Sequence, residues 1–122
     1  MTQRIIMLLV SATGGVAPLA ISSDTATQLK EIQDLVGGYV EAYRVPVEAF
    51  PDTHITMLVN DDGKALGLSP NVAATRLMRP GAWLTHDQVI VGEAILTVLD
   101  EATGDHTSMP PEVARWLTQA AG

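Results

Sequence analysis

A helix that ends on two glycines and turns directly into a strand is the feature that most constrains the fold. Residues 24–45 read DTATQLKEIQDLVGGYVEAYRV, and the apolar residues of the first half recur at helical spacing. Asp24 is suited to cap the amino end of a helix, and Gly37 suits the left-handed conformation that ends one. Gly38 then allows a tight reversal. This pattern predicts a helix over 25–36 followed by a strand over 39–45.

The remaining elements follow from shorter patterns. The apolar run over 4–10 is too short for a secretion signal or a membrane span, so it indicates a buried strand. Asp62-Gly63 favours a tight hairpin turn, and Gly92 suggests a bulge or bend inside a strand. The other expected elements are short strands at 19–21 and 65–68, longer strands over 54–60 and 88–98, a short helix ending at Met78, and a helix starting at 110–111.

These elements predict an α+β fold. We expect one domain over 1–122, with a mixed or mainly antiparallel sheet of about five strands packed on one main helix, and a C-terminal helix. A single layer of strands with one helix leaves a sheet face to cover, which favours a homodimer.

Charge and composition exclude several function classes. The net charge is −7, and only Lys30, Lys64 and five arginines are basic, which disfavours general nucleic-acid binding. The absence of cysteine excludes disulfides, thiolate metal sites and cysteine nucleophiles.

Four motifs in a fixed order carry a family resemblance. They are LVGGYVE at 35–41, VNDDGKALGL at 59–68, PN and AT at 70–75, and IVG at 90–92. Together these motifs resemble the family called domain of unknown function 3846, which is met in bacteriophages and other mobile elements. The resemblance covers about residues 24–96 and leaves a helical extension at about 108–121 outside it. Asp62 departs from the glutamate that similar sequences often carry.

The resemblance implies an intracellular protein of a phage, prophage or plasmid, acting in the cytoplasm of the host. It implies no activity, cofactor or ligand set.

No motif of known catalytic or cofactor chemistry is present. The sequence contains no GxxxxGK[ST], GxGxxG or GxSxG pattern. His54, His86 and His106 are far apart, without the close partner that helps to build a metal site. Gly37-Gly38 follows a helix, whereas phosphate binding favours the amino end of one. We therefore predict no catalytic residue, no metal and no cofactor.

A few polar residues are candidates for ligand binding. Glu41 lies between two tyrosines on one strand face, where it either binds a ligand or lines an exposed sheet face. Asn71 is either a turn residue bonded to its own backbone or part of a polar site beside the Gly37-Gly38 corner. The full candidate set is Glu41, Tyr39, Tyr43, Asn71, Arg76 and Arg79, and the structural turns are assigned to Gly37, Gly38, Gly63 and Gly92.

Three functions are compatible with these observations. The first is a non-enzymatic phage or mobile-element accessory protein that binds a host component, with a host protein as the expected partner. The second is a protein that binds or sequesters a small nucleotide-like molecule through Arg76, Arg79, Asn71 and Glu41. The third is a small hydrolase that uses Glu41 or Asp61 as an acid or base, which requires a buried carboxylate facing a cleft.

Overall fold

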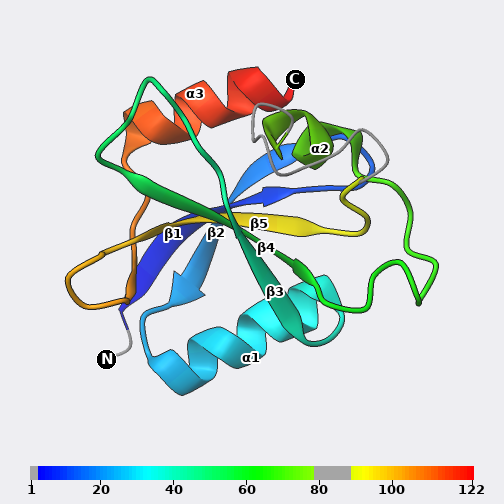
Figure 1. The fold of residues 1–122 in the computed structure, drawn as a ribbon. Coiled ribbons are helices and arrows are strands. Elements are labelled where there is room, and N and C mark those ends of the chain that lie inside the picture. Colours follow the sequence, from blue (N-terminus) through cyan, green and yellow to red (C-terminus); the bar gives the residue numbers. More distant parts are fainter. Residues whose placement is uncertain (1–2, 79–88) are drawn as a thin grey trace.

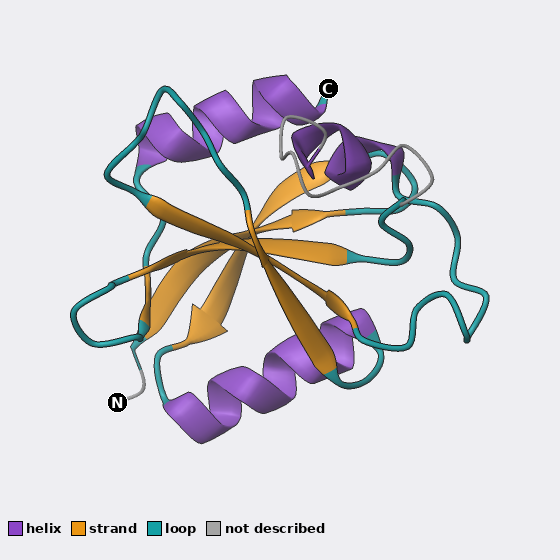
Figure 2. Ribbon diagram, viewed as in Figure 1, coloured by secondary structure: helices purple, strands orange, loops and turns teal. Residues whose placement is uncertain are grey.

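Helices cover both faces of an antiparallel sheet in a computed structural model that describes residues 3–78 and 89–122 (Figures 1 and 2). The strand order is β2-β1-β5-β4-β3, with β6 paired to β5, and all these pairs are antiparallel. This is the predicted α+β class. Arg79 and His86 lie outside the described residues. The elements are β1 (Arg4–Val10), β2 (Val16–Ser22), α1 (Thr25–Val36), β3 (Val40–Arg44), β4 (His54–Asn60), α2 (Val72–Met78), β5 (Ala94–Leu99), β6 (His106–Thr107) and α3 (Pro111–Ala121).

Two apolar clusters lie on opposite faces of the sheet. On β1, Met7 belongs to the cluster under α1, whereas Leu8 and Val10 belong to the cluster under α2 and α3. Successive side chains of a strand point to opposite faces, so an apolar run over 4–10 serves both clusters. The sheet face that we expected a second copy to cover is therefore covered by α2 and α3 of the same chain. The homodimer itself stays a prediction.

Helix α1 begins and ends as predicted. The Asp24 carboxylate accepts a hydrogen bond from the N–H of Thr27 at 3.1 Å. At the other end, Gly37 is left-handed (φ 84°), and the N–H groups of Gly37 and Gly38 both donate to the carbonyl of Gln33. The chain then enters β3 within three residues.

The hairpin predicted after β4 is wrong. Residues 61–67 form turns instead of a return strand, and the N–H of Leu68 donates to the carbonyl of Gly63 at 3.0 Å. Gly63 has no positive φ. A Cβ at this position would lie 2.8 Å from Cγ2 of Val91, so the glycine allows close packing, not a tight hairpin turn.

Other strands also differ from the prediction. Strand β2 has seven residues where we expected a short strand at 19–21. Strand β5 begins at Ala94, because Gly92 turns the chain with φ 78° and donates its N–H to the carbonyl of Ser69. The bend expected at Gly92 is thus confirmed, but it precedes the strand. The two-residue strand β6 was not predicted.

The C-terminal helix is part of the core and not an appendage. Val113 and Leu117 of α3 are buried in the same cluster as Leu77 and Met78 of α2. Trp116 is 38% exposed and packs edge-to-face on Phe50, with ring centroids 6.3 Å apart. Within residues 3–78 and 89–122, no helix has the length and apolar character needed to cross a membrane.

Candidate functional site

A carboxylate and a phenol form a pair on strand β3. Glu41 and Tyr43 are alternate residues, so both point to the sheet face that packs on α2 and α3. The Tyr43 hydroxyl donates to Oε1 of Glu41 at 2.5 Å. Burial, reinforced by the neighbouring Glu41 carboxylate, raises the pKa of Tyr43 to about 12. The phenol therefore stays protonated at neutral pH and acts as a hydrogen-bond donor.

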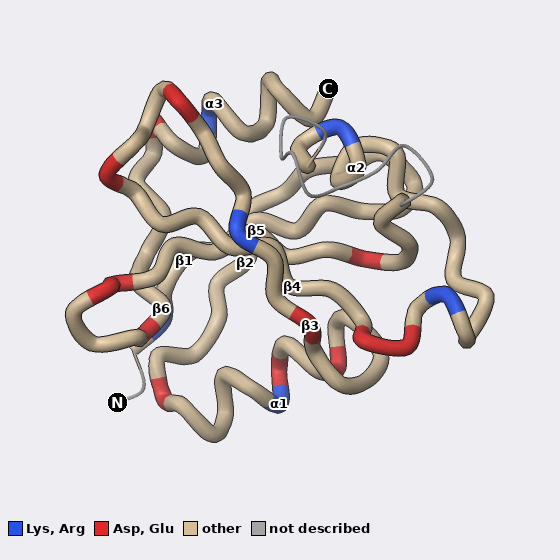
Figure 3. Tube along the Cα trace, viewed as in Figure 1, with Lys and Arg blue, Asp and Glu red and all other residues tan. Residues whose placement is uncertain are grey.

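This pair lies in a pocket of about 340 Å³ with an acidic lining. The pairing of β3 with β4 brings the residues that follow β4 beside Glu41. Figure 3 shows red segments on β3 and just after β4 in this region. Among the described lining residues there are three carboxylates and one ammonium group, so this part of the lining favours a cationic group. We call this site the acidic pocket; it is lined by Glu41, Tyr43, Asp61, Asp62, Lys64 and residues 89–91, among others.

Within residues 3–78 and 89–122, nothing covers the outer edge of β3 beside the acidic pocket. The N–H of Asp61 donates to the carbonyl of Tyr39, and the N–H of Val45 donates to the carbonyl of Ile55, both at 2.8 Å. In an antiparallel pair, the residues that bond to the neighbouring strand alternate with those that point away. The main-chain groups of three residues therefore point outward, and no described residue bonds to them: Val40, Ala42 and Arg44.

The opposite edge of the sheet, strand β2, is closed. Pro18 has no N–H to offer at an outward position. The Arg4 guanidinium donates to the carbonyl of Ala20 at 3.1 Å, and the N–H of Ser22 donates to Oε1 of Glu31 at 3.2 Å. Arg4 and Glu31 also pair with each other at 3.2 Å. Natural sheets commonly protect their edges in these ways, so the contrast makes the bare edge of β3 informative.

The structure separates Tyr39 from the other two β3 candidates. Tyr39 precedes the strand, is 74% exposed and lines a shallow depression with Gly37 and Gly38, away from the acidic pocket. The expected face of Tyr39, Glu41 and Tyr43 therefore holds only the last two in the pocket.

Asn71 is buried and forms hydrogen bonds with backbone groups of the described residues. It is fully buried, and its Nδ2 donates to the carbonyls of Val10 and Gly92 at 2.8 and 2.9 Å. Its Oδ1 accepts from the N–H of Ala74 at the start of α2. The asparagine beside the Gly37-Gly38 corner is instead Asn60.

Arg76 does not join Glu41 either. Arg76 donates to the carbonyl of Gly122 at 3.0 Å and borders a separate pocket of about 300 Å³ near Pro70. Arg79 is outside the described residues. The five candidates within the described residues are thus spread over several places, and among these five only Glu41 and Tyr43 share a pocket.

The sequence predicts a turn at Asp62 and does not indicate that Asp62 and Lys64 line a pocket with Glu41. The alternation of β3 against β4 was the signal that relates them to Glu41, but it gives no register without the structure. Among residues 3–78 and 89–122, no group of three histidine or carboxylate side chains is placed to hold a metal ion.

Comparison with known protein families identifies the family of this chain. The family model described as "Domain of unknown function (DUF3846)" matches residues 5–121. The match extends to both sides of the 24–96 region that carries the resemblance, and it includes the whole C-terminal helix α3. No curated protein and no solved structure matches the chain.

Proposed function

The chain belongs to the DUF3846 family, and we propose that it is a non-enzymatic accessory protein of a phage or other mobile element that binds a host protein. The open edge of β3 is the observation that carries this proposal. The binding mode is strand addition, in which an extended segment of the partner continues the sheet and forms main-chain hydrogen bonds with the edge.

The edge offers a partner both affinity and selectivity. The outward N–H and C=O groups of Val40, Ala42 and Arg44 supply the hydrogen bonds of a new ladder. On one face of that ladder, alternate partner side chains come next to Glu41, and Asp61 and Asp62 lie one strand further, just after the end of β4. Because this lining is acidic, the partner segment carries lysine or arginine at alternate positions.

A second copy of the chain fits the same edge less well. Antiparallel pairing of two β3 strands about a twofold axis normal to the sheet keeps each face of the two copies on the same side. The Glu41, Asp61 and Asp62 carboxylates of both copies would then share one face. The resulting repulsion disfavours a homodimer through β3, and a basic partner relieves it.

Proline scanning of the two edges tests the proposal. Ala42→Pro removes an outward N–H that no described neighbour uses, just as Pro18 does on β2, so the fold should be retained. Ala20→Pro is the matched control, since Ala20 is also an exposed alanine on an outward position of an edge strand. Circular dichroism and thermal unfolding of both variants check the fold.

The probe is a short synthetic peptide of alternating lysine and valine, with a glutamate–valine peptide for comparison. In fluorescence anisotropy, the lysine peptide should bind the wild type and Ala20→Pro equally. It should bind Ala42→Pro at least about tenfold more weakly, because a hydrogen bond is lost and the proline ring blocks the edge. The glutamate peptide should not bind.

Affinity purification from host cells extends the test to the natural partner. A protein retained by the wild type and Ala20→Pro but lost by Ala42→Pro supports the proposal. Equal binding of both peptides, or equal binding by both proline variants, contradicts it. A wild-type dimer in light scattering that becomes a monomer with Ala42→Pro assigns the edge to a second copy and also overturns the proposal.

A further inference from the structure

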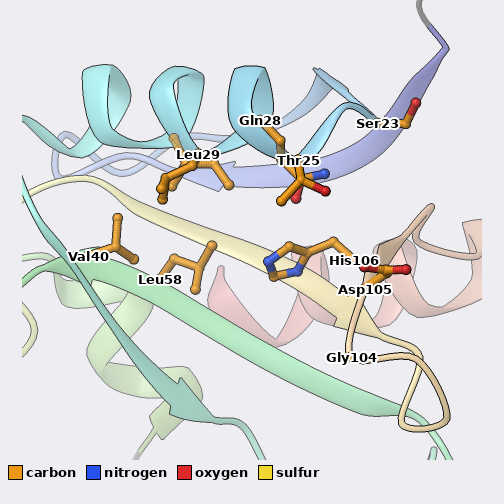
Figure 4. A pocket seen from close by; sticks show the side chains of 10 residues that line it. Ser23, Thr25, Gln28, Leu29, Val40, Leu58, Gly104, Asp105 and His106 are labelled. Atoms are coloured by element: carbon orange, nitrogen blue, oxygen red, sulfur yellow. The ribbon is translucent and has the colours of Figure 1, made fainter.

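A second pocket lies on the other face of the sheet, between α1 and strands β3 and β4. It has a volume of about 480 Å³, within the range of small-molecule sites. Figure 4 shows that α1 forms one wall and the sheet forms the other, with the loop before β6 at one end. We call it the α1 pocket. It does not share the acidic lining described above, and the inference drawn from it is independent of the proposed function.

One half of the α1 pocket is apolar and incompletely filled. Leu29 lies on the apolar stripe of α1 yet is 52% exposed, because it faces this pocket and not the packed core. Val40, Leu58 and Ile32 complete the apolar wall. Four aliphatic side chains around an open space form a surface that gains from contact with an aliphatic group.

The other half contains a histidine in a defined hydrogen bond. Nδ1 of His106 lies 3.0 Å from Oγ1 of Thr97, which is fully buried. The hydroxyl of Thr56, the residue paired with Thr97 on β4, has no partner in the described part of the chain. With the Thr97 hydroxyl as the donor in this pair, Nδ1 of His106 accepts. The ring proton of neutral His106 then lies on Nε2, as a donor available to the pocket.

The charge of the pocket selects against anions. Burial lowers the pKa of His106, while Asp105 opposes this shift, so the ring is neutral at physiological pH. Asp105 and His106 are the two ionisable residues among the lining side chains. A carboxylate or phosphate in the pocket would lie near the exposed Asp105 carboxylate, with no cation among the described lining residues to offset that charge.

We propose that the α1 pocket binds a small neutral molecule with an aliphatic body and a carbonyl oxygen, such as an aliphatic amide or ester. The aliphatic body contacts Leu29, Val40 and Leu58. The carbonyl oxygen accepts a hydrogen bond from Nε2 of His106. A ligand of this kind accounts for the exposure of Leu29, the hydrogen bond that orients His106 and the lack of a cation among the described lining residues.

Three probes with the same chain and different head groups test the chemistry: hexanamide, hexanoate and hexylammonium. Binding is followed by NMR through the methyl groups of Leu29 and Leu58 and the imidazole signals of His106 near pH 7.5. Hexanamide should shift these signals with saturation, and hexanoate should bind at least about tenfold more weakly. Equal binding of all three probes, or absence of shifts with hexanamide, overturns the proposal. Tighter binding of hexylammonium makes the pocket an amine site and also overturns it.

Variants separate the two halves of the pocket. His106→Phe keeps a ring but removes the donor, and it should weaken hexanamide about tenfold. His54→Phe is the control, because His54 is another strand histidine that does not line this pocket. Leu29→Glu changes an exposed helix residue, so it should preserve the fold and abolish binding even if His106→Phe does not fold. Unchanged affinity in Leu29→Glu contradicts the assignment of the site.

Discussion

Asn60 holds the carboxyl end of α1 from 24 residues away: its Nδ2 donates to the carbonyl oxygen of Val36 at 2.9 Å. The same side chain accepts from the N–H of Asp62 at 2.7 Å through Oδ1. Asn60 is buried, and a Cβ on Gly38 would lie 3.1 Å from Nδ2. The side-chain amide of Asn60 therefore links the carboxyl end of α1, the turn at Gly38 and the end of β4.

Asn60→Asp should lower the free energy of unfolding by about 1–3 kcal/mol. A carboxylate cannot donate to the carbonyl of Val36, so a buried acceptor is left without its partner. Urea denaturation followed by circular dichroism measures the loss. Gln119→Glu, a similar change at an exposed position of α3, is the control and should be close to neutral. Equal stability of the two variants would show that the Asn60 bond contributes little.

The same corner shows how far the sequence predicts this fold. Helix 25–36, its Asp24 cap and the Gly37 stop were predicted because each depends on neighbours within a few residues. The role of Asn60 was not, because its partner at Val36 becomes a neighbour only after β3 and β4 pair. Strand β6 was not predicted either, because a strand of two residues has no periodicity and is defined only by its pairing with β5.

The sequence predicts the β3 side of the acidic pocket but not the residues that follow β4. The alternation of β3 placed Glu41 and Tyr43 on one face, as observed. Asp62-Gly63 predicts a hairpin turn, because Asp-Gly is common in such turns. Close packing of Gly63 on Val91, which is distant in sequence, decides the actual path of the chain.

Substitutions at two glycines with similar φ angles distinguish the cost of backbone strain from the cost of steric crowding. Gly92 and Gly104 have φ values of 78° and 77°, but only Gly92 has a close neighbour, since a Cβ there would lie 2.7 Å from Cδ1 of Leu68. Gly104→Ala should cost about 1–2 kcal/mol through backbone strain alone. Gly92→Ala should cost a further 1–3 kcal/mol, roughly, through overpacking. Thermal and urea unfolding of both variants measure the difference, and identical losses would show that Leu68 moves aside without cost.

His106 should make stability depend on pH below about 6.5. Its pKa is lowered in the folded state, mainly by burial, relative to the ordinary value of 6.5. The unfolded state therefore binds the proton more readily, and the free energy of unfolding falls as the pH decreases below that value. His106→Phe should remove this part of the slope between about pH 7.5 and pH 5. Urea denaturation at several pH values measures it, and parallel curves for the wild type and the variant would contradict the assignment.

The two edges of the sheet should respond in opposite ways to substitution. Pro18 and the Arg4–Glu31 pair close β2, so Pro18→Thr combined with Glu31→Ala restores one outward N–H and frees that of Ser22. An exposed strand edge is a template for pairing with other chains, and β2 is rich in small residues that offer no steric or charged barrier. The double variant should self-associate with increasing concentration in sedimentation velocity, whereas Ala42→Pro on β3 should not. The contrary outcome is a double variant that keeps the oligomeric state of the wild type at all concentrations. That result would show that Pro18 and Glu31 do not serve to prevent pairing at β2. The open edge of β3 would then no longer indicate a binding edge.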